Sequence, residues 1–454
     1  MERNLSEKKQ GTLQRELGFW SLVMFGVIFM SPTAGLVYYV TTQPWSGGFT
    51  WLAFAIAAVL IIFTVLSYQI MVQKFPQTGS AYTYASKGIN GKAGFMTGWI
   101  LLIDYALTPL FALSLSSIYL NSVFPAVPIN VFIVCLGILV TICTCLGVKV
   151  SVMAQILIGS YLILLILFFD SHALIQIFST GKPLFNPDTI YDPDKIIWPG
   201  VFQAVGLALL AHVGFDGITT LAEESKVSPK KISDSLMVSV IIIATLFISS
   251  TYLANTAMEW TTIPENDFPT AYRYMLSVWI NPALAGTLVV LQKIGSVTLM
   301  IAAITATSRI LYGMGRDRVI NNRFFGHLSP RFNTPTRSTI LIGIITIVGA
   351  LTIEWYVIAE IVSFGACIGF IAVNLSNISF FWVKAKDKSQ RRVLRNLVFP
   401  LFAAGGILWV MFSLSRLCLI AGFSWTAVGL LYLLIKYKTS EDFRSAINRG
   451  IEGL

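Results

Sequence analysis

Two acidic residues lie inside strongly apolar stretches of this sequence, where charge is costly. Asp104 stands in GWILLIDYALTPLF, and Asp216 stands between two glycines in VGFDGITT. A charged side chain at the centre of a membrane helix costs about 2.5–3.5 kcal/mol on insertion scales, so such residues usually face a bundle interior or a cavity. We expect Asp104 and Asp216 to bind an ammonium group or carry a proton. For Asp104 the alternative is a carboxylate that backbone groups cap or a lysine pairs.

The apolar stretch that contains Asp216 ends in a pair of acidic residues, Glu223 and Glu224. Asp216, Thr220 and Glu223 are spaced four and three residues apart, which places them on one face of a continuous helix. We expect that helix face to line the inner half of a pathway through the membrane. For Glu223 and Glu224 themselves we favour an inner gate or an interfacial ion pair with Lys226.

Three further polar features lie in or beside apolar runs. His212 is a candidate for proton coupling or gating because an unperturbed histidine titrates near neutral pH, but a single histidine in an apolar helix is more often a hydrogen-bonded filler. Lys293 and Glu360 have matched depth and opposite charge, so an ion pair between them is a hypothesis. The hydroxyl cluster 305–309 could ligate sodium, although membrane helices use Ser and Thr mostly for packing.

One of the apolar runs around these residues contains residue types that would break a helix near its middle. In GVIFMSPTAGLVYYV the order is Ser31, Pro32, Thr33, Ala34 and Gly35. Proline cannot donate to the helix ladder, and glycine allows an unwound backbone. In lipid, the freed backbone groups must be buried in protein or face a watery cavity. The alternatives are a simple proline kink and a substrate site made by a discontinuous helix.

A second interruption favours the substrate site. Gly214 and Gly217 bracket Asp216 near the middle of a run five helices further along. Interrupted segments at corresponding places in two halves indicate an inverted-repeat transporter with its site at the interruptions. We therefore include Val213 and Gly214, with Ser31, Thr33, Ala34 and Gly35, among the expected binding residues.

Composition and run length define the class of protein. Hydrophobic residues make up 55% of the 454 residues and charged residues 12%, against about 25% charged in a soluble domain. A spanning helix needs about 20 apolar residues. Twelve such runs follow one another: 17–41, 49–72, 93–121, 128–148, 150–170, 198–222, 234–257, 283–313, 337–353, 355–383, 397–416 and 417–437. We predict an all-α integral membrane protein with twelve transmembrane helices, of which helices 1 and 6 are broken.

The net charge of +10 follows topology and does not indicate a nucleic-acid partner. With the N-terminus inside, 27 of the 32 Lys and Arg fall on the inner side and three on the outer side, as the positive-inside rule requires. We expect a multi-pass inner (plasma) membrane protein with both termini cytoplasmic. The polar start of the chain argues against a cleavable signal peptide. Residues 1–454 form one polytopic domain.

Catalytic and cofactor motifs are not found in the sequence. There is no P-loop, no H-E-x-x-H helix and no G-x-S-x-G elbow. The five cysteines lack zinc-ligand spacing and are best explained as small buried hydrophobes. We expect neither an enzyme nor a bound metal or cofactor.

Four segments carry a family resemblance: FPQTGSAYTYASKGINGKAGFMTGWILLIDY, VGFDGITTLAEES, SRILYGMGRDRVINNRFFGHLSPRFNTP and SFGACIGFIAVNLS. They resemble the amino acid–polyamine–organocation permeases, and within them the bacterial putrescine importers. The resemblance implies a five-plus-five inverted repeat (about 17–170 and 198–383) with two extra helices (about 397–437). It also implies alternating access, coupled to protons or to exchange, with substrate between the two breaks.

The resemblance also assigns residues. The helix-3 acid of the putrescine importers corresponds to Asp104, the helix-6 acid to Asp216, the acidic pair to Glu223 and Glu224, and the helix-10 asparagine to Asn374. The chain departs from the pattern at three places. Pro32 weakens a carboxylate clamp at the first break, Val37 replaces an aspartate, and Leu210 with Ala211 replaces an aromatic gate.

Three functions remain open at this point. The first is a proton-coupled importer of putrescine, a polyamine or another small organic cation. The second is an amino acid permease or exchanger that binds the carboxylate at the first break. The third is a non-transporting membrane sensor, which would be expected to add a soluble domain or long tail after the last run.

Overall fold

The computed structural model describes residues 15–146, 148–258, 268–330, 332, 334–385 and 392–452. The regular secondary structure of these residues is helical apart from one isolated β-bridge between Leu17 and Ser225. The inner helices are α1 (Phe19–Phe29), α2 (Ala34–Ser46), α3 (Thr50–Lys74), α5 (Gly91–Val123), α7 (Val148–Ser179), α9 (Trp198–Ala211), α10 (Gly217–Thr220), α11 (Pro229–Ala257), α13 (Pro282–Arg316) and α16 (Trp355–Ile378).

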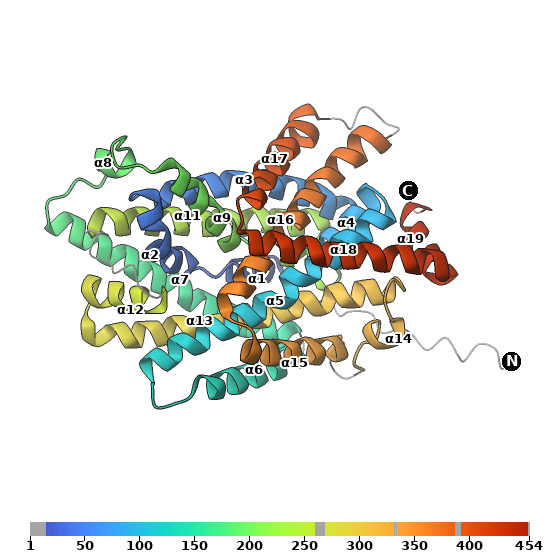
Figure 1. The fold of residues 1–454 in the computed structure, drawn as a ribbon, viewed down its shortest axis with the longest axis horizontal. Helices are drawn as coiled ribbons and strands as arrows, with labels where there is room; N and C mark the ends of the chain where they lie inside the picture. Colours follow the sequence, from blue (N-terminus) through green and yellow to red (C-terminus); the bar gives the residue numbers. More distant parts are fainter. Residues whose placement is uncertain are drawn as a thin grey trace.

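The remaining elements surround this group or connect its members (Figure 1). They are α4 (Ala81–Gly88), α6 (Ile129–Cys145), α8 (Pro187–Ile190), the 3₁₀ turn η1 (Ala222–Glu224), α12 (Phe268–Trp279), α14 (Asn322–Phe325), α15 (Thr336–Thr352), the π-helical turns η3 (Ser379–Lys384) and η5 (Leu394–Val398), α17 (Phe399–Phe412), α18 (Arg416–Thr439) and α19 (Glu441–Glu452). All twelve predicted apolar runs overlap helices of the structure.

Length and composition qualify nine helical segments of the described chain as membrane spans, and three further apolar helices are shorter. The short ones are Ile129–Cys145, Trp198–Ala211 and Thr336–Thr352. The second is short because the sixth run breaks in its middle. The chain is therefore a multi-pass helical membrane protein.

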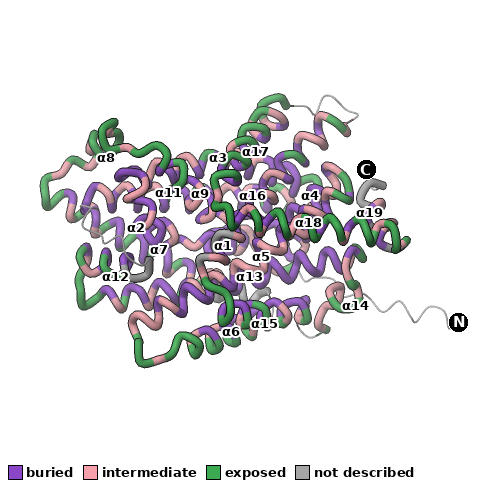
Figure 2. Tube along the Cα trace, in the orientation of Figure 1, coloured by how far each residue is buried: buried purple, intermediate pink, exposed green. Residues whose placement is uncertain are grey.

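Burial separates the inner helices from a lipid-facing shell. Figure 2 shows mostly buried positions along α1, α3, α5 and α13 and exposed positions along α6, α17 and α18. The exposed positions are largely apolar, for example Phe402, Leu430, Leu431, Leu434 and Ile435. An apolar outer surface of this size fits hydrocarbon as its solvent.

Segments predicted on opposite sides of the membrane lie at opposite ends of the molecule. In Figure 1, α8 and α12 from the expected outer loops lie at one end, and α14 and α19 from the expected inner segments lie at the other. Which end faces the cytoplasm stays a prediction.

Candidate functional site

The first apolar run is divided into two helices where the sequence predicts a break. Helix α1 ends at Phe29, and α2 begins at Ala34. Ser31 between them has a φ of +52°, a left-handed conformation that is uncommon for a residue with a side chain. Pro32 follows it and cannot supply a backbone donor.

The second break lies directly against the first. Helix α9 ends at Ala211, α10 begins at Gly217, and Gly214 has a φ of +120°. A Cβ atom on Gly214 would lie 2.7 Å from Cγ and 3.0 Å from the carbonyl carbon of Phe29. Only glycine fits this conformation and this approach.

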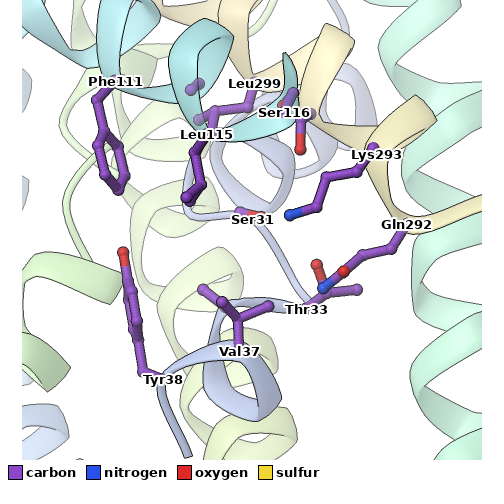
Figure 3. A pocket seen from close by; sticks show the side chains of 13 residues that line it. Ser31, Thr33, Val37, Tyr38, Phe111, Leu115, Ser116, Gln292, Lys293 and Leu299 are labelled. Atoms are coloured by element: carbon purple, nitrogen blue, oxygen red, sulfur yellow. The ribbon is translucent and has the colours of Figure 1, made fainter. Parts of the chain in front are cut away.

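Two small adjoining cavities lie at the first break, with volumes of about 60 and 50 Å³. Both are lined by Ser31, Ala34, Tyr38, Phe111 and Leu299. The larger also has Thr33, Val37, Ser116, Gln292 and Lys293 on its wall (Figure 3). The smaller has Thr108 and Val213 on its wall. Gly35 lines neither cavity. A Cβ atom added to Gly35 would lie 2.9 Å from the Cδ1 atom of Phe247 in α11, so the helices approach closely there.

Asp216 is held by two tyrosine hydroxyls from neighbouring helices. Its Oδ2 atom accepts a hydrogen bond from Tyr105 Oη of α5 and one of 3.5 Å from Tyr68 Oη of α3. Its Oδ1 atom is buried and has no hydrogen-bond partner among the residues that the structure describes.

Asp104 lies one residue before Tyr105 and is also buried. Its Oδ1 atom accepts a hydrogen bond of 3.3 Å from Thr108, which lines the smaller cavity. A Cβ on Gly365 of α16 would lie 2.8 Å from that of Asp104, so α16 covers the acid closely. Within the described parts of the chain, neither Asp104 nor Asp216 has a cationic side chain within 4.0 Å. The lysine-paired interpretation of Asp104 therefore finds no support there.

His212 has an intrahelical partner. Its Nδ1 atom lies 2.7 Å from the carbonyl oxygen of Ala208, and its ring packs against Phe54 and Phe247. Its Nε2 atom is buried and without a partner in the described structure. His212 lines neither of the two cavities.

The acidic pair binds arginines, and the predicted pairing with Lys226 is wrong. Glu224 forms two contacts with Arg309, Nε–Oε1 at 2.7 Å and Nη2–Oε2 at 3.3 Å, and both side chains are only 1% exposed. Glu223 accepts from Arg316 Nη1 at 2.8 and 2.9 Å and from the Thr78 amide at 3.0 Å.

The prediction that Asp216, Thr220 and Glu223 share one helix face is also wrong, because it assumed a continuous helix. Helix α10 ends at Thr220, and the chain continues through a 3₁₀ turn. Asp216 consequently contacts α3 and α5, whereas Glu223 contacts the end of α13.

Arg316 extends this ionic cluster to the end of α13. Its Nε atom lies 3.5 Å from Asp317 Oδ1, and Tyr82 Oη donates to Asp317 Oδ2 at 3.0 Å. Burial, with the Asp317 charge beside it, raises the pKa of Tyr82 well above its usual value, so the hydroxyl stays a donor.

Asn374 and the hydroxyl cluster make contacts between helices. Asn374 accepts from Ser67 at 2.8 Å and donates to Thr64 at 3.1 Å, which ties α16 to α3. Thr307 donates to the carbonyl oxygens of Tyr105 and Ala303, both at 2.7 Å. The sodium hypothesis stays a prediction, as does the Lys293–Glu360 pair, because the Glu360 side chain lies outside the described residues.

Sequence reasoning missed the partners that complete the site. Tyr68, Tyr105, Arg309 and Arg316 hold the predicted acids, and Gln292 shares the cavity wall with Lys293. The sequence signal for these residues was the presence of polar residues within apolar runs. That signal does not identify their partners on distant helices.

The fold and the site define a multi-pass helical membrane protein with two broken helices beside internal cavities. Residues 17–437 match the family model described as amino acid permease, so the chain belongs to the amino acid permease family.

Curated relatives in this family are transporters. The chain is 29% identical over 452 residues to the low-affinity putrescine importer PlaP of Escherichia coli K12, with 96% of each chain covered. It is 24% identical to the methylthioribose transporter of Bacillus subtilis, with 97% of each chain covered. It is 22% identical to the branched-chain amino acid permease BcaP of the same species, with 95% of each covered.

One solved structure supports the fold. It is described as the substrate-bound outward-open state of a Na⁺-coupled sialic acid symporter and superposes with a TM-score of 0.56. The alignment covers 89% of this chain and 92% of that one at 14% identity. At this identity the likeness concerns the fold alone.

Proposed function

We propose that the protein is a secondary active transporter that imports a small amine-bearing solute by alternating access. Its substrate is an amino acid or a polyamine such as putrescine. One observation carries the proposal: two buried carboxylates, Asp104 and Asp216, lie beside the meeting breaks without a cationic side chain in the described structure. Isolated buried charge is costly, and a substrate ammonium or a proton would neutralise it.

In this proposal the substrate occupies the cavities at the two breaks. Ser31, Thr33 and Ala34 contact it from the first break, and Val213 and Gly214 from the second. Gly35 supports the same break through its contact with α11.

Asp104 and Asp216 act as counter-ions for the ammonium, and one of them carries the coupled proton. His212 is a weaker candidate for coupling because its Nδ1 atom already contacts the Ala208 carbonyl. Glu223 and Glu224, with their arginine partners, form the inner gate.

The proposed architecture has twelve crossings, with repeats at about 17–170 and 198–383 and two extra helices at about 397–437. The three short apolar helices then also cross the membrane. Both termini face the cytoplasm, and the host membrane is an inner (plasma) membrane, as the distribution of Lys and Arg favours.

The second candidate is an amino acid exchanger that binds the substrate carboxylate at the first break. The polar side chains of Ser31 and Thr33 on the cavity wall favour it. The family relatives include both an amino acid permease and a putrescine importer by name, so both substrate classes belong in the test.

Proteoliposomes with an acidic exterior and an alkaline interior test the proposal. Labelled putrescine and a labelled neutral amino acid are offered in parallel, with empty vesicles and a protonophore as controls. We expect uptake of at least one solute that collapses with the protonophore. Uptake that ignores the gradient but requires internal amino acid would favour the exchanger, and equal signals from protein and empty vesicles would reject both.

A further inference from the structure

Lys293 of α13 is a buried cation on the wall of the larger cavity. Its side chain is 6% exposed, and its Nζ atom lies 3.8 Å from the centroid of the Tyr119 ring. A cation over an aromatic face is stabilised by the ring quadrupole, more so when it is desolvated. No carboxylate of the described side chains lies within 4.0 Å of it. Figure 3 shows its amine pointing into the cavity toward Ser31.

Gln292 supplies a second unsatisfied group on the same wall. Its side chain is 2% exposed, and both Nε2 and Oε1 are buried without a partner in the described structure. Figure 3 shows the amide directed toward Thr33 at the first break. A buried amide without partners is disfavoured, so an occupant that accepts its hydrogen bond would be selected.

We infer that Lys293 and Gln292, with the Ser31 and Thr33 hydroxyls, form an anion subsite that receives a substrate carboxylate. Lysine and the Gln amide supply donors, and the hydroxyls add two more. A carboxylate can accept charge-assisted and neutral hydrogen bonds from all of these donors, whereas the Gln292 Oε1 atom is itself an acceptor and needs a donor from another group. The inference rests on the proposed function, because it names the group that would occupy one end of the same cavity system.

Neither Asp104 nor Asp216 lines either of the two cavities, but Asp104 lies behind the wall of the smaller one, away from the subsite. Lys293 and Gln292 line the larger cavity, whereas Thr108, which binds Asp104, lines the smaller one. The two cavities share Ser31, Ala34 and Tyr38. A molecule with a carboxylate at one end and an ammonium at the other matches this charge arrangement. An alkyl diamine would place its second ammonium against Lys293. The selected class is therefore an amino acid.

Matched pairs of ligands that differ only in a carboxylate test this inference. Leucine is compared with isopentylamine, and ornithine with putrescine, as inhibitors and labelled substrates in proteoliposomes. The wild type should prefer the carboxylated member about ten- to a hundredfold, the ratio expected for one hydrogen-bonded charged contact. Lys293→Met and Gln292→Leu should reduce this ratio, and Lys293→Arg should retain part of it.

Lys231→Met is the matched control. Lys231 also lies over an aromatic ring, 5.4 Å from the centroid of Phe19, but it is exposed and lines neither cavity. Its replacement should leave the ratio unchanged. Size-exclusion chromatography of each variant separates misfolding from altered selectivity, and the ratio itself is insensitive to the amount of active protein.

Three outcomes would overturn the inference. One is an unchanged ratio in Lys293→Met, and another is a wild-type preference for the amines, both with transport intact. The third is recovery of the ratio in Lys293→Met/Glu360→Gln, which would make Lys293 the partner of Glu360. Absence of uptake for all four ligands would instead reject the proposed function, and the subsite with it.

Discussion

Tyr105 of α5 donates a hydrogen bond to Asp216 at the break between α9 and α10. The preceding residue on α5 is the other buried acid, Asp104. One helix therefore carries one acid and positions the second. Any movement of the second break relative to α5 must alter this hydrogen bond.

Tyr105→Phe should reduce the initial rate of uptake by about ten- to a hundredfold. The change removes a donor to a carboxylate, a contact worth about 1.5–3 kcal/mol. Tyr68→Phe should have a smaller effect, because its hydroxyl lies 3.5 Å from the same oxygen. Initial rates in proteoliposomes measure both variants, and equal defects would show that the two hydroxyls are equivalent.

Gly214→Ala should abolish transport or the folded yield. The added Cβ would meet both the ring and the backbone of Phe29, and the φ of +120° is strained for alanine. Gly405→Ala on α17 is the matched control, because nothing lies within 4 Å of its Cβ position. Fluorescence-detected chromatography and uptake should show a normal control; a functional Gly214→Ala protein would refute the proposed contact between the breaks.

Arg309→Met should destabilise the protein strongly. It leaves the Glu224 charge buried without its partner, which typically costs about 3–5 kcal/mol. Thermal denaturation in detergent measures the loss. The double variant Arg309→Met/Glu224→Gln should recover part of it, and a double variant that is no more stable than Arg309→Met would contradict this assignment.

Arg316→Met should lower the melting temperature much less. The Arg316 and Glu223 side chains are 32% and 26% exposed, and partly solvated pairs contribute about 0–1 kcal/mol. If the pair belongs to the inner gate, its loss should instead change the uptake rate. A large loss of stability together with an unchanged rate would assign the pair a structural role.

Val37→Asp should shift selectivity toward amines. Val37 and Lys293 line the same cavity, so a carboxylate there would neutralise the lysine and attract a second ammonium. Competition by putrescine should strengthen and competition by ornithine should weaken. Stronger competition by ornithine would place the substrate carboxylate elsewhere.

The sequence was sufficient to predict the two helix breaks and the overlap of all apolar runs with helices. These features are local, because Pro32 and Gly214 act on their own backbone. The partners of the acids were not predictable in this way. Tyr105 and Arg309 lie 111 and 85 positions from Asp216 and Glu224, and only packing of helices brings such residues together.

The residue spacing led to a wrong prediction where a continuous helix was assumed. Asp216 and Glu223 share a face only if the helix continues past Thr220, and α10 ends there. Lys226 was the nearest cation along the chain, yet α13 supplies the arginines that bind Glu223 and Glu224.

The most direct test compares three Asp→Asn variants in the uptake assay. Asp104→Asn and Asp216→Asn remove the proposed counter-ions beside the two breaks, whereas Asp170→Asn changes a buried acid of α7 that accepts a hydrogen bond of 3.1 Å from Ser249. Asp104→Asn and Asp216→Asn should both lose gradient-driven uptake, and Asp170→Asn should retain it. Normal uptake by folded Asp104→Asn and Asp216→Asn proteins would exclude both acids as counter-ions or proton carriers.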